Sequence, residues 1–289
     1  RQEIAASGGW ISFARFMELA LYAPGLGYYS AGAAKFGDSG DFVTAPEISS
    51  LFGRTLARQA AQVLRLTRGD MLEIGAGSGR LALQLLLELE AMDTLPGHYY
   101  VLEVSADLQE RQQAFIQARA PRFLKRMVWL EQLPSSFTGL ILGNEVLDAM
   151  PVHLVAWRHD GLYERGVGAG KNGFVWRERP LVDGALFHAA RRLPVRAEYL
   201  SEIGLAVPAF VNSLAQILRQ GVVLMIDYGF GESEYYHPQR AEGTLMCHYR
   251  HHAHGDPFYL PGLQDITAHV DFSAVAAAAH VSASKWRLG

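Results

Sequence analysis

The 289-residue chain has little of three things that would each define a class of protein. Its one cysteine, Cys247, excludes an internal disulfide framework and suits a reducing compartment. No apolar run approaches the ~18 residues that a membrane-spanning helix needs, and no signal-like apolar segment opens the chain. The 26 basic and 29 acidic residues give a net charge of -3, so no general positive field exists to attract nucleic acid. We therefore expect a small-molecule or protein substrate.

The rest of the composition is that of a globular protein. Hydrophobic residues make up 49% of the chain and charged residues 19%, which is enough apolar material for a sizeable core. We predict an α/β fold in four segments. They are an N-terminal extension and lid (1–60), a cofactor-binding core (61–150), an inserted antiparallel β meander (151–200), and the return of the core sheet with a C-terminal segment (201–289).

The most informative stretch is a predicted strand, tight turn and helix between residues 71 and 92. Residues 71–74 are apolar enough for a buried strand, and a leucine-rich run follows over 80–92. Glycines at alternate positions between them let the backbone approach a ligand without a Cβ atom in the way. The free N–H groups at the helix start favour polar groups. The residues expected to bind a nucleotide-like cofactor here are Gly75, Ala76, Gly77 and Gly79.

Two acidic residues indicate which cofactor this is. A dinucleotide fingerprint needs a glycine where Arg80 stands. Glu73 precedes the first glycine by two residues, and its carboxylate would repel a pyrophosphate but accept the ammonium of an amino-acid group. Glu103, near the end of the strand predicted over 99–105, can accept two ribose hydroxyls. An ammonium and a ribose without phosphate indicate S-adenosylmethionine (SAM), with S-adenosylhomocysteine as product; the alternative is a glycine turn with two surface acids.

Strands and helices continue to alternate after this turn, as a parallel sheet requires. Besides the helix over 80–92, we predict helices over 106–119 and 208–219 and strands over 99–105, 127–130, 140–143 and 222–226. Leu130 ends one of these strands and would touch adenine if that edge faces the base, although a plain core position fits the sequence equally well. A further helix rich in alanine is expected over 265–279.

The segment after the strand at 140–143 is the second informative one. Loops at the carboxyl ends of parallel strands form the ligand crevice, so Asn144, Glu145 and Asp148 should lie beside the transferable methyl group. We expect Asn144 to contact the cofactor and the two acids to act in catalysis. The alternative is that these two acids mark a helix start, where acidic side chains are stabilised by the positive end of the helix dipole.

The N-terminal residues are too apolar for a solvated loop. A helix is predicted over 11–22, with Ser12 as its N-cap. The glycine-rich stretch that follows is interpreted as a lid, with Phe42 and Thr44 lining the cofactor and Glu47 facing the substrate as a third catalytic candidate. A packed connector is the competing interpretation.

The middle of the chain departs from the strand–helix rhythm. Residues 153–158, 162–167 and 174–179 alternate apolar and polar groups between hairpin-type turns, which predicts an antiparallel meander. Residues 191–202 are interpreted as irregular chain. Histidines cluster beside Cys247, but nothing places four ligands at a recognised metal spacing, and methyl transfer needs no metal. We therefore predict no metal site.

Several motifs together resemble one family, the MidA-like SAM-dependent methyltransferases, which include a mitochondrial complex I assembly factor that methylates an arginine. The resemblance extends over nearly the whole chain. One departure is that little here matches a further pair of strands that usually follows the last motif. The motifs lie at residues 27–29, 40–49, 73–79, 144–151, 227–229, 243–245 and 265–272.

The resemblance implies a class I (Rossmann-like) methyltransferase fold, SAM at residues 73–79 and Glu103, and symmetric dimethylation of a protein arginine. Glu145 and Asp148, and then Glu47, are the residues expected to place carboxylates against the guanidinium. The alternatives are a SAM-binding assembly scaffold and a small-molecule N- or O-methyltransferase. A homodimer is plausible for the family, and no membrane insertion is expected. The location would be cytoplasmic for a bacterial protein and the mitochondrial matrix for a eukaryotic one.

Overall fold

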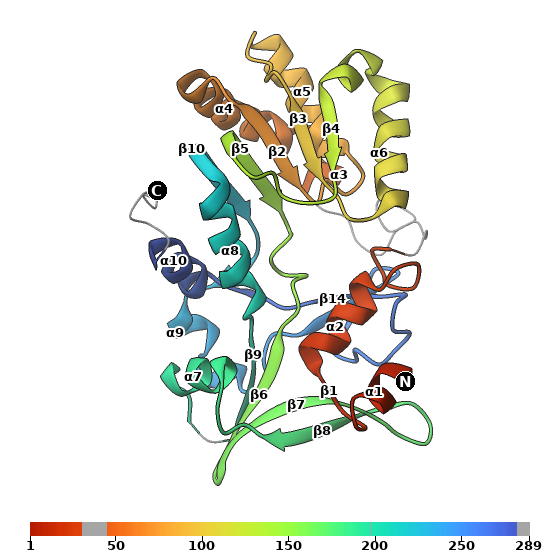
Figure 1. Ribbon diagram of the computed structural model, residues 1–289, viewed down its shortest axis with the longest axis vertical. Helices are drawn as coiled ribbons and strands as arrows, with labels where there is room; N and C mark the ends of the chain where they lie inside the picture. Colours follow the sequence, from red (N-terminus) through yellow and green to blue (C-terminus); the bar gives the residue numbers. More distant parts are fainter. Residues whose placement is uncertain (31–44, 197, 282–289) are drawn as a thin grey trace.

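The computed structural model describes residues 1–30, 45–196 and 198–281 (Figure 1). A five-stranded sheet lies in one half of the molecule, and all of its neighbouring strands are parallel. Its strands, in spatial order, are β10 (Leu218–Ile226), β5 (Phe137–Asn144), β2 (Asp70–Ile74), β3 (Tyr99–Leu102) and β4 (Met127–Leu130).

Helices cover both faces of this parallel sheet, because its strands alternate apolar side chains between the faces. On β5, Leu140 and Leu142 belong to a core shared with the helices on one face, whereas Ile141 between them faces the helix on the other. The first face carries α4 (Ser50–Thr67), α5 (Arg80–Ala91) and α6 (Ala106–Arg119), and the second carries α8 (Ala206–Ile217). The sheet is therefore buried on both sides.

A second, antiparallel sheet occupies the other half of the molecule (Figure 1). The strands predicted between residues 153 and 179 are β6 (His153–Arg158), β7 (Gly161–Ala169) and β8 (Phe174–Pro180), and they pair in chain order. Two further strands join them, with β9 (Tyr199–Ile203) against β6 and β1 (Ile11–Ser12) against β7.

The N-terminal helices pack on this second sheet. The pair is α1 (Gln2–Ala6) and α2 (Phe13–Tyr22), and the predicted cap of α2 is confirmed, because the Ser12 hydroxyl accepts a hydrogen bond from the Arg15 backbone N–H at 3.1 Å. Phe13, Phe16 and Met17 are buried in a core with residues of β6 and β7. The N-terminal segment is thus part of the framework of this half.

Short elements complete the fold. Strands β12 (Met246–Tyr249), β13 (His252–His254) and β14 (Asp265–Thr267) form a small antiparallel sheet, and β11 (Gly229–Phe230) pairs with β15 (Val270–Asp271). The remaining α-helices are α3 (Ala45–Ile48), α7 (Ala185–Arg192), α9 (Glu232–Tyr235) and α10 (Phe272–Val281). None of the helices described has the length and apolar character needed to cross a membrane.

Two predicted elements were wrong. The helix expected over 265–279 begins only at Phe272, because residues 265–267 pair with β12. The Asp271 carboxylate accepts hydrogen bonds from the backbone N–H groups of Ser273 and Ala274 at 2.9 and 3.2 Å, which fixes the helix start.

Residues 191–202, interpreted as irregular chain, include the end of α7 and most of β9. The buried Glu202 hid the strand pattern in the sequence. Its carboxylate accepts hydrogen bonds from the backbone N–H groups of Thr244 and Leu245, each at 3.0 Å. Helix α4, which runs through residue 60, was not among the predicted elements.

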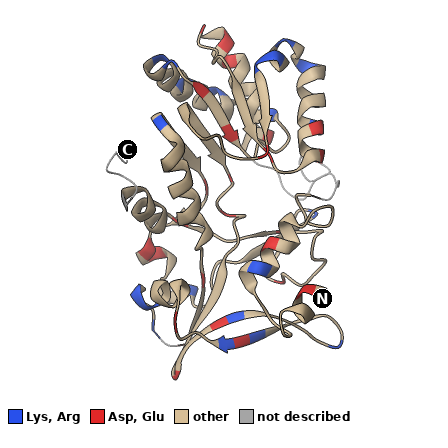
Figure 2. Ribbon diagram, in the orientation of Figure 1, with Lys and Arg blue, Asp and Glu red and all other residues tan. Residues whose placement is uncertain are grey.

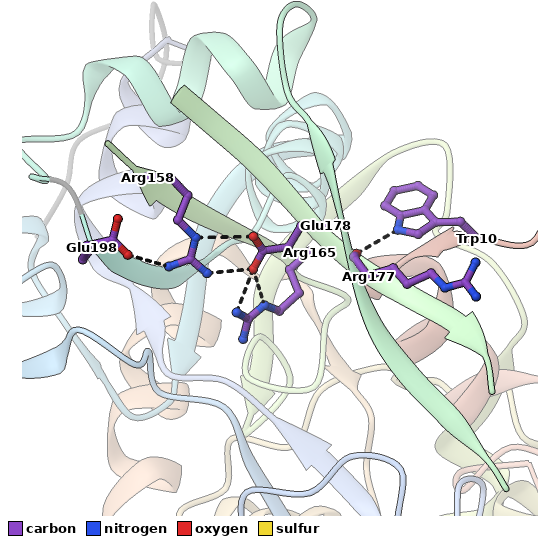
Figure 3. A network of polar contacts seen from close by, with 6 residues as sticks. All are labelled: Trp10, Arg158, Arg165, Arg177, Glu178 and Glu198. Carbon is purple, nitrogen blue, oxygen red and sulfur yellow. Dashed lines mark hydrogen bonds and ion pairs between the residues drawn. The ribbon is translucent and has the colours of Figure 1, made fainter. Parts of the chain in front are cut away.

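Ion pairs connect three strands on the exposed face of the antiparallel sheet. Figure 2 shows acidic and basic residues alternating along β7 and β8, and Figure 3 shows the contacts. The Glu178 carboxylate on β8 accepts hydrogen bonds from Arg165 on β7 at 2.7 Å and from Arg158 on β6 at 2.8 Å. Arg158 also contacts Glu198 at 3.1 Å. Burial opposes ionisation of Glu178, but the bonds from both arginines outweigh it and lower its pKa.

We predict that Glu178→Gln lowers the free energy of unfolding by about 1 kcal/mol at pH 7, because one acceptor serves two guanidinium groups. The lowered pKa makes this contribution complete above the ordinary value of 4.5 and removes it as pH falls through the folded-state value. Urea denaturation of both proteins at several pH values measures the difference. Glu110→Gln, on the exposed surface of α6, is the control and should change nothing. The prediction is contradicted if Glu178→Gln has the same free energy of unfolding as the wild type, or if the difference between them does not change with pH.

Candidate functional site

A cavity of about 780 Å³ lies at the carboxyl end of the parallel sheet. Its walls come from the turn between β2 and α5, from the end of β3 and from the loop after β5. Helices α2 and α8 contribute Tyr22 and Phe210 to it. This is the edge at which α/β sheets bind ligands, because the loops leaving parallel strands converge there.

The turn between β2 and α5 has the backbone conformation for which the glycines were singled out. Gly75, Gly77 and Gly79 have φ angles of 64, 53 and 79°, in the left-handed region that favours glycine. Gly75, Ala76 and Gly77 line the cavity, whereas Gly79 caps α5. A Cβ atom at Gly75 would meet only Val146, at 3.6 Å, so the turn leaves room for a ligand beside the backbone.

Glu73 is a buried acid at the base of this cavity. It lines the cavity together with residues of the glycine turn, and its carboxylate accepts a hydrogen bond from the Tyr99 hydroxyl at 2.6 Å. Burial raises the pKa of Glu73 to about 7, against the lowering effect of that bond. A carboxylate in this state binds best to a ligand that brings a positive charge.

Glu103 lies at the end of β3, on the same cavity wall. Its two carboxylate oxygens accept hydrogen bonds from the Ser105 backbone N–H at 3.0 Å and from the Gln112 side chain at 3.2 Å. Gln112 also donates to the Gly77 carbonyl at 3.0 Å and accepts from Trp129 at 2.9 Å. It therefore ties the glycine turn to β3 and β4. Sequence reasoning missed Gln112, because nothing marks one glutamine of a polar helix as buried.

Glu47 lies beside the glycine turn. Its carboxylate pairs with Arg80 at 2.8 Å and accepts a hydrogen bond from the Ser78 hydroxyl. Arg80 neutralises the Glu47 charge, and Glu47 lines the cavity. The structure thus brings Glu47 to the turn, and its expected contact with a substrate stays a prediction.

Asp227, which follows β10, holds the loop that carries Glu145 and Asp148. One of its oxygens accepts hydrogen bonds from the backbone N–H groups of Val146, Leu147 and Asp148, at 3.1, 2.8 and 3.3 Å. Glu145 has a φ of 52°, a strained conformation for a residue with a Cβ atom, and its own N–H donates to the Ile226 carbonyl at 2.8 Å. Such strain persists only where the surroundings enforce it.

A second cavity of about 320 Å³ adjoins the first, and Glu145 and Tyr29 line both. Asp148 lines the second cavity and accepts a hydrogen bond from the Tyr228 hydroxyl at 2.5 Å. Burial, followed by the charge of Asp227, raises the pKa of both Glu145 and Asp148. The expected pair of acids therefore shares a region, with Glu145 at the junction and Asp148 inside the smaller cavity.

The structure places the other predicted site residues differently with respect to the larger cavity. Asn144 lines the larger cavity, as expected for a cofactor contact. Leu130 does not line it, because its side chain packs in the core between the sheet and α8. Phe42 and Thr44 lie outside the described residues. Within the part of the chain that the structure describes, no group of three His, Cys, Asp or Glu side chains is arranged to hold a metal.

This geometry, a glycine turn and buried acids at the carboxyl edge of a parallel sheet, is that of an α/β cofactor-binding protein. The chain belongs to the Methyltransf_28 family of S-adenosyl-L-methionine-dependent methyltransferases, whose family model matches residues 55–288. The resemblance read from the motifs is confirmed. SAM, the predicted cofactor, is the cofactor of this family.

Similar proteins are known from bacteria and animals. A Burkholderia thailandensis protein crystallised with S-adenosyl-homocysteine is 49% identical, with a TM-score of 0.94, covering 98% of this chain and 75% of that one. The mitochondrial protein arginine methyltransferase NDUFAF7 of Danio rerio is 27% identical over 92% of this chain, and its Caenorhabditis elegans homolog is 28% identical over 91%. The chain spans about two thirds of the length of these two animal relatives, 67% in each case.

We predict that Glu73→Gln stabilises the ligand-free protein at pH 8 by on the order of 2 kcal/mol. The folded state raises this pKa, so ionisation opposes folding progressively as pH rises from the ordinary 4.5 to about 7 and fully above that. The amide still accepts the Tyr99 bond. Chemical denaturation at pH 4 and pH 8 measures the effect, which should be absent at pH 4. A variant that is less stable at pH 8 contradicts the assignment.

We expect Asp227→Ala to lower the free energy of unfolding by roughly 2 kcal/mol, because four backbone N–H groups, three in the loop and that of Tyr228, lose their acceptor. The matched control is Asp183→Ala, which removes an exposed carboxylate that accepts a single N–H, from Gly184. Denaturation curves compare the two variants. Equal effects would show that the loop does not depend on Asp227.

Proposed function

We propose that this protein transfers the methyl group of SAM to a guanidine nitrogen of an arginine in a protein substrate. The observation that carries the proposal is the charge of the joined cavities. The larger one is lined by five glutamates, and none of its described lining residues is Lys, Arg or His. Its glutamates are Glu18, Glu47, Glu73, Glu103 and Glu145. Since Glu18 and Glu47 pair with Arg15 and Arg80, the charge of the site comes from the other three. Such a site favours cationic ligands and disfavours phosphates.

The residues of the larger cavity fit the cofactor. Glu73 accepts the ammonium group of the methionine portion, and its buried charge gains a partner when SAM binds. Glu103, already oriented by Ser105 and Gln112, accepts the ribose hydroxyls. Asn144 and the backbone of residues 75–77 line the space between them. SAM, when bound, supplies a methyl group already activated on a positively charged sulfur.

Glu145 has the position required of the residue that orients the acceptor. It lies at the junction of the two cavities, so its carboxylate can hold one side of a guanidinium while the other side faces the cofactor. Its raised pKa also lets it take up the proton that the guanidinium loses once the new N–C bond has formed. Asp148 acts from deeper in the smaller cavity.

Two animal relatives are named protein arginine methyltransferases, which supports a protein arginine as the acceptor. A SAM-binding scaffold would have no need of a second acidic cavity opening onto the first, which favours an enzyme over the scaffold alternative. We also propose that the parallel sheet is the Rossmann-like methyltransferase core. The sheet of β6 to β9 is then an insertion on the substrate side.

Incubation with SAM labelled in the methyl group and a cell lysate tests the activity. We expect label in protein, recovered as methylated arginine by mass spectrometry. Label in lysine alone, or in small molecules alone, overturns arginine as the acceptor, and no transfer of label despite SAM binding supports the scaffold.

We predict that Glu145→Gln reduces methyl transfer by at least about 100-fold while SAM affinity stays within threefold, because the amide cannot orient a cation or take its proton. Glu73→Gln should instead act on cofactor binding and lower the affinity for SAM at least about tenfold. Calorimetry with SAM and single-turnover transfer separate the two effects. Glu110→Gln is the control, and full activity of Glu145→Gln contradicts its role.

A further inference from the structure

The smaller cavity contains acids and aromatic rings that the cofactor does not use. Three carboxylates line it from two separate segments, namely the loop after β5 and the strand β14. They are Glu145 and Asp148 from that loop and Asp265 from the strand. The charges of Asp265 and Glu145 are both felt at Asp148, so the three acids are close in space. The same walls carry Tyr29, Tyr228 and His269.

Two buried polar atoms in this cavity lack hydrogen-bond partners. Asp148 is 5% exposed, and while one oxygen accepts the Tyr228 bond, the other, Oδ1, has no partner. The Nδ1 atom of His269 has none either. Buried polar atoms are rarely left unpaired unless a ligand or water pairs with them. An orphaned carboxylate oxygen requires a hydrogen-bond donor, and a cationic donor best offsets its buried charge.

The aromatic walls have fixed orientations. The His269 ring stacks on Phe230, with 5.2 Å between centroids and an interplanar angle of 13°, and meets Tyr228 edge to face at 5.1 Å. The His269 backbone N–H donates to the Thr244 hydroxyl at 3.1 Å. Tyr29 donates its hydroxyl to Asp265 at 3.0 Å and so orients that carboxylate. Flat rings beside carboxylates suit a planar cation, which can both stack and donate hydrogen bonds.

We propose that the smaller cavity is the pocket for the substrate guanidinium, with Asp148 and Asp265 as the residues that bind it and select arginine over lysine. The proposal rests on the proposed function and deepens it. A guanidinium has five N–H donors in a planar fork and can reach carboxylates on different walls at once. An ammonium carries its three donors on a single atom, so it cannot satisfy acids on separate walls equally. Tyr29 is a positioning residue that acts through Asp265.

The test measures binding without catalysis. The probes are Nα-acetyl-arginine methylamide and Nα-acetyl-lysine methylamide, titrated into the full chain in the presence of S-adenosyl-homocysteine and followed by calorimetry or NMR. We expect the arginine probe to bind at least about tenfold more tightly than the lysine probe. Equal affinities, or no binding of the arginine probe up to roughly 10 mM, overturn the assignment.

Amide variants of the two acids locate the binding. Asp148→Asn and Asp265→Asn should each weaken the arginine probe at least about tenfold and leave S-adenosyl-homocysteine affinity within twofold. Tyr29→Phe should weaken the probe by a smaller factor, roughly threefold, since the carboxylate itself remains. Cofactor binding shows that each variant is folded, and Glu110→Gln is the matched control. Variants that bind the probe as wild type does overturn the pocket.

Methyl transfer separates this inference from the function on which it rests. Suppose that the wild type binds the arginine probe and both amide variants do not, yet the wild type transfers no methyl group. The pocket then stands and the proposed function fails. If the wild type methylates protein arginine while both variants keep an unchanged KM, the function stands and the pocket assignment fails. A raised KM in both variants supports both.

Discussion

The carboxylate of Asp227 is the contact on which the site depends. It accepts three consecutive backbone N–H groups of the loop that leads from β5, in the parallel sheet, to β6, in the antiparallel sheet. That loop carries both Glu145 and Asp148. Because charged acceptors make strong hydrogen bonds, one side chain fixes the place where the two halves of the molecule meet. The strained φ of Glu145 is maintained by the same anchoring.

The acids around this loop make the ligand-free protein less stable than its fold allows. Burial raises the pKa of Glu73, Glu145 and Asp148, which means that each resists carrying its charge. Buried carboxylates of this kind persist when a ligand supplies the missing positive charge. The sulfonium cofactor and the guanidinium that we propose as substrate are both cations, so one electrostatic environment would serve both. The same buried carboxylates therefore lower the stability of the ligand-free protein and favour the binding of cationic ligands.

The N-terminal helix α2 both packs against the antiparallel sheet and helps to form the larger cavity. Its apolar face is buried against the antiparallel sheet, through Phe13, Phe16 and Met17. Its last residue, Tyr22, lines the larger cavity and donates its hydroxyl to the Ala149 carbonyl at 3.0 Å. Tyr29, a few residues later, reaches Asp265. Packing of one helix therefore places two tyrosines at the site.

Local sequence determined the glycine turn and the places of the two acids expected to bind the cofactor. Glycine at positions 75, 77 and 79 suits their left-handed backbone, and Glu73 lies in β2 and Glu103 directly after β3, where the spacing along the chain predicted them. Helix α6 and strand β4 begin and end where the pattern predicted. Leu130 packs in the core between the sheet and α8, which is the alternative that the sequence left open, because a strand end can face a core as well as a cofactor.

Only the tertiary structure decided what lines the smaller cavity. Tyr29, Asp148 and the pair of Asp265 and His269 come from three segments far apart in sequence, and no local pattern predicts that they share one cavity. Two elements were missed for the same reason, since residues 265–267 pair with β12 and the buried Glu202 of β9 accepts the Thr244 N–H. Local conformation follows from neighbouring residues, whereas a pocket of charges forms only when folding brings separate segments together and removes water from them.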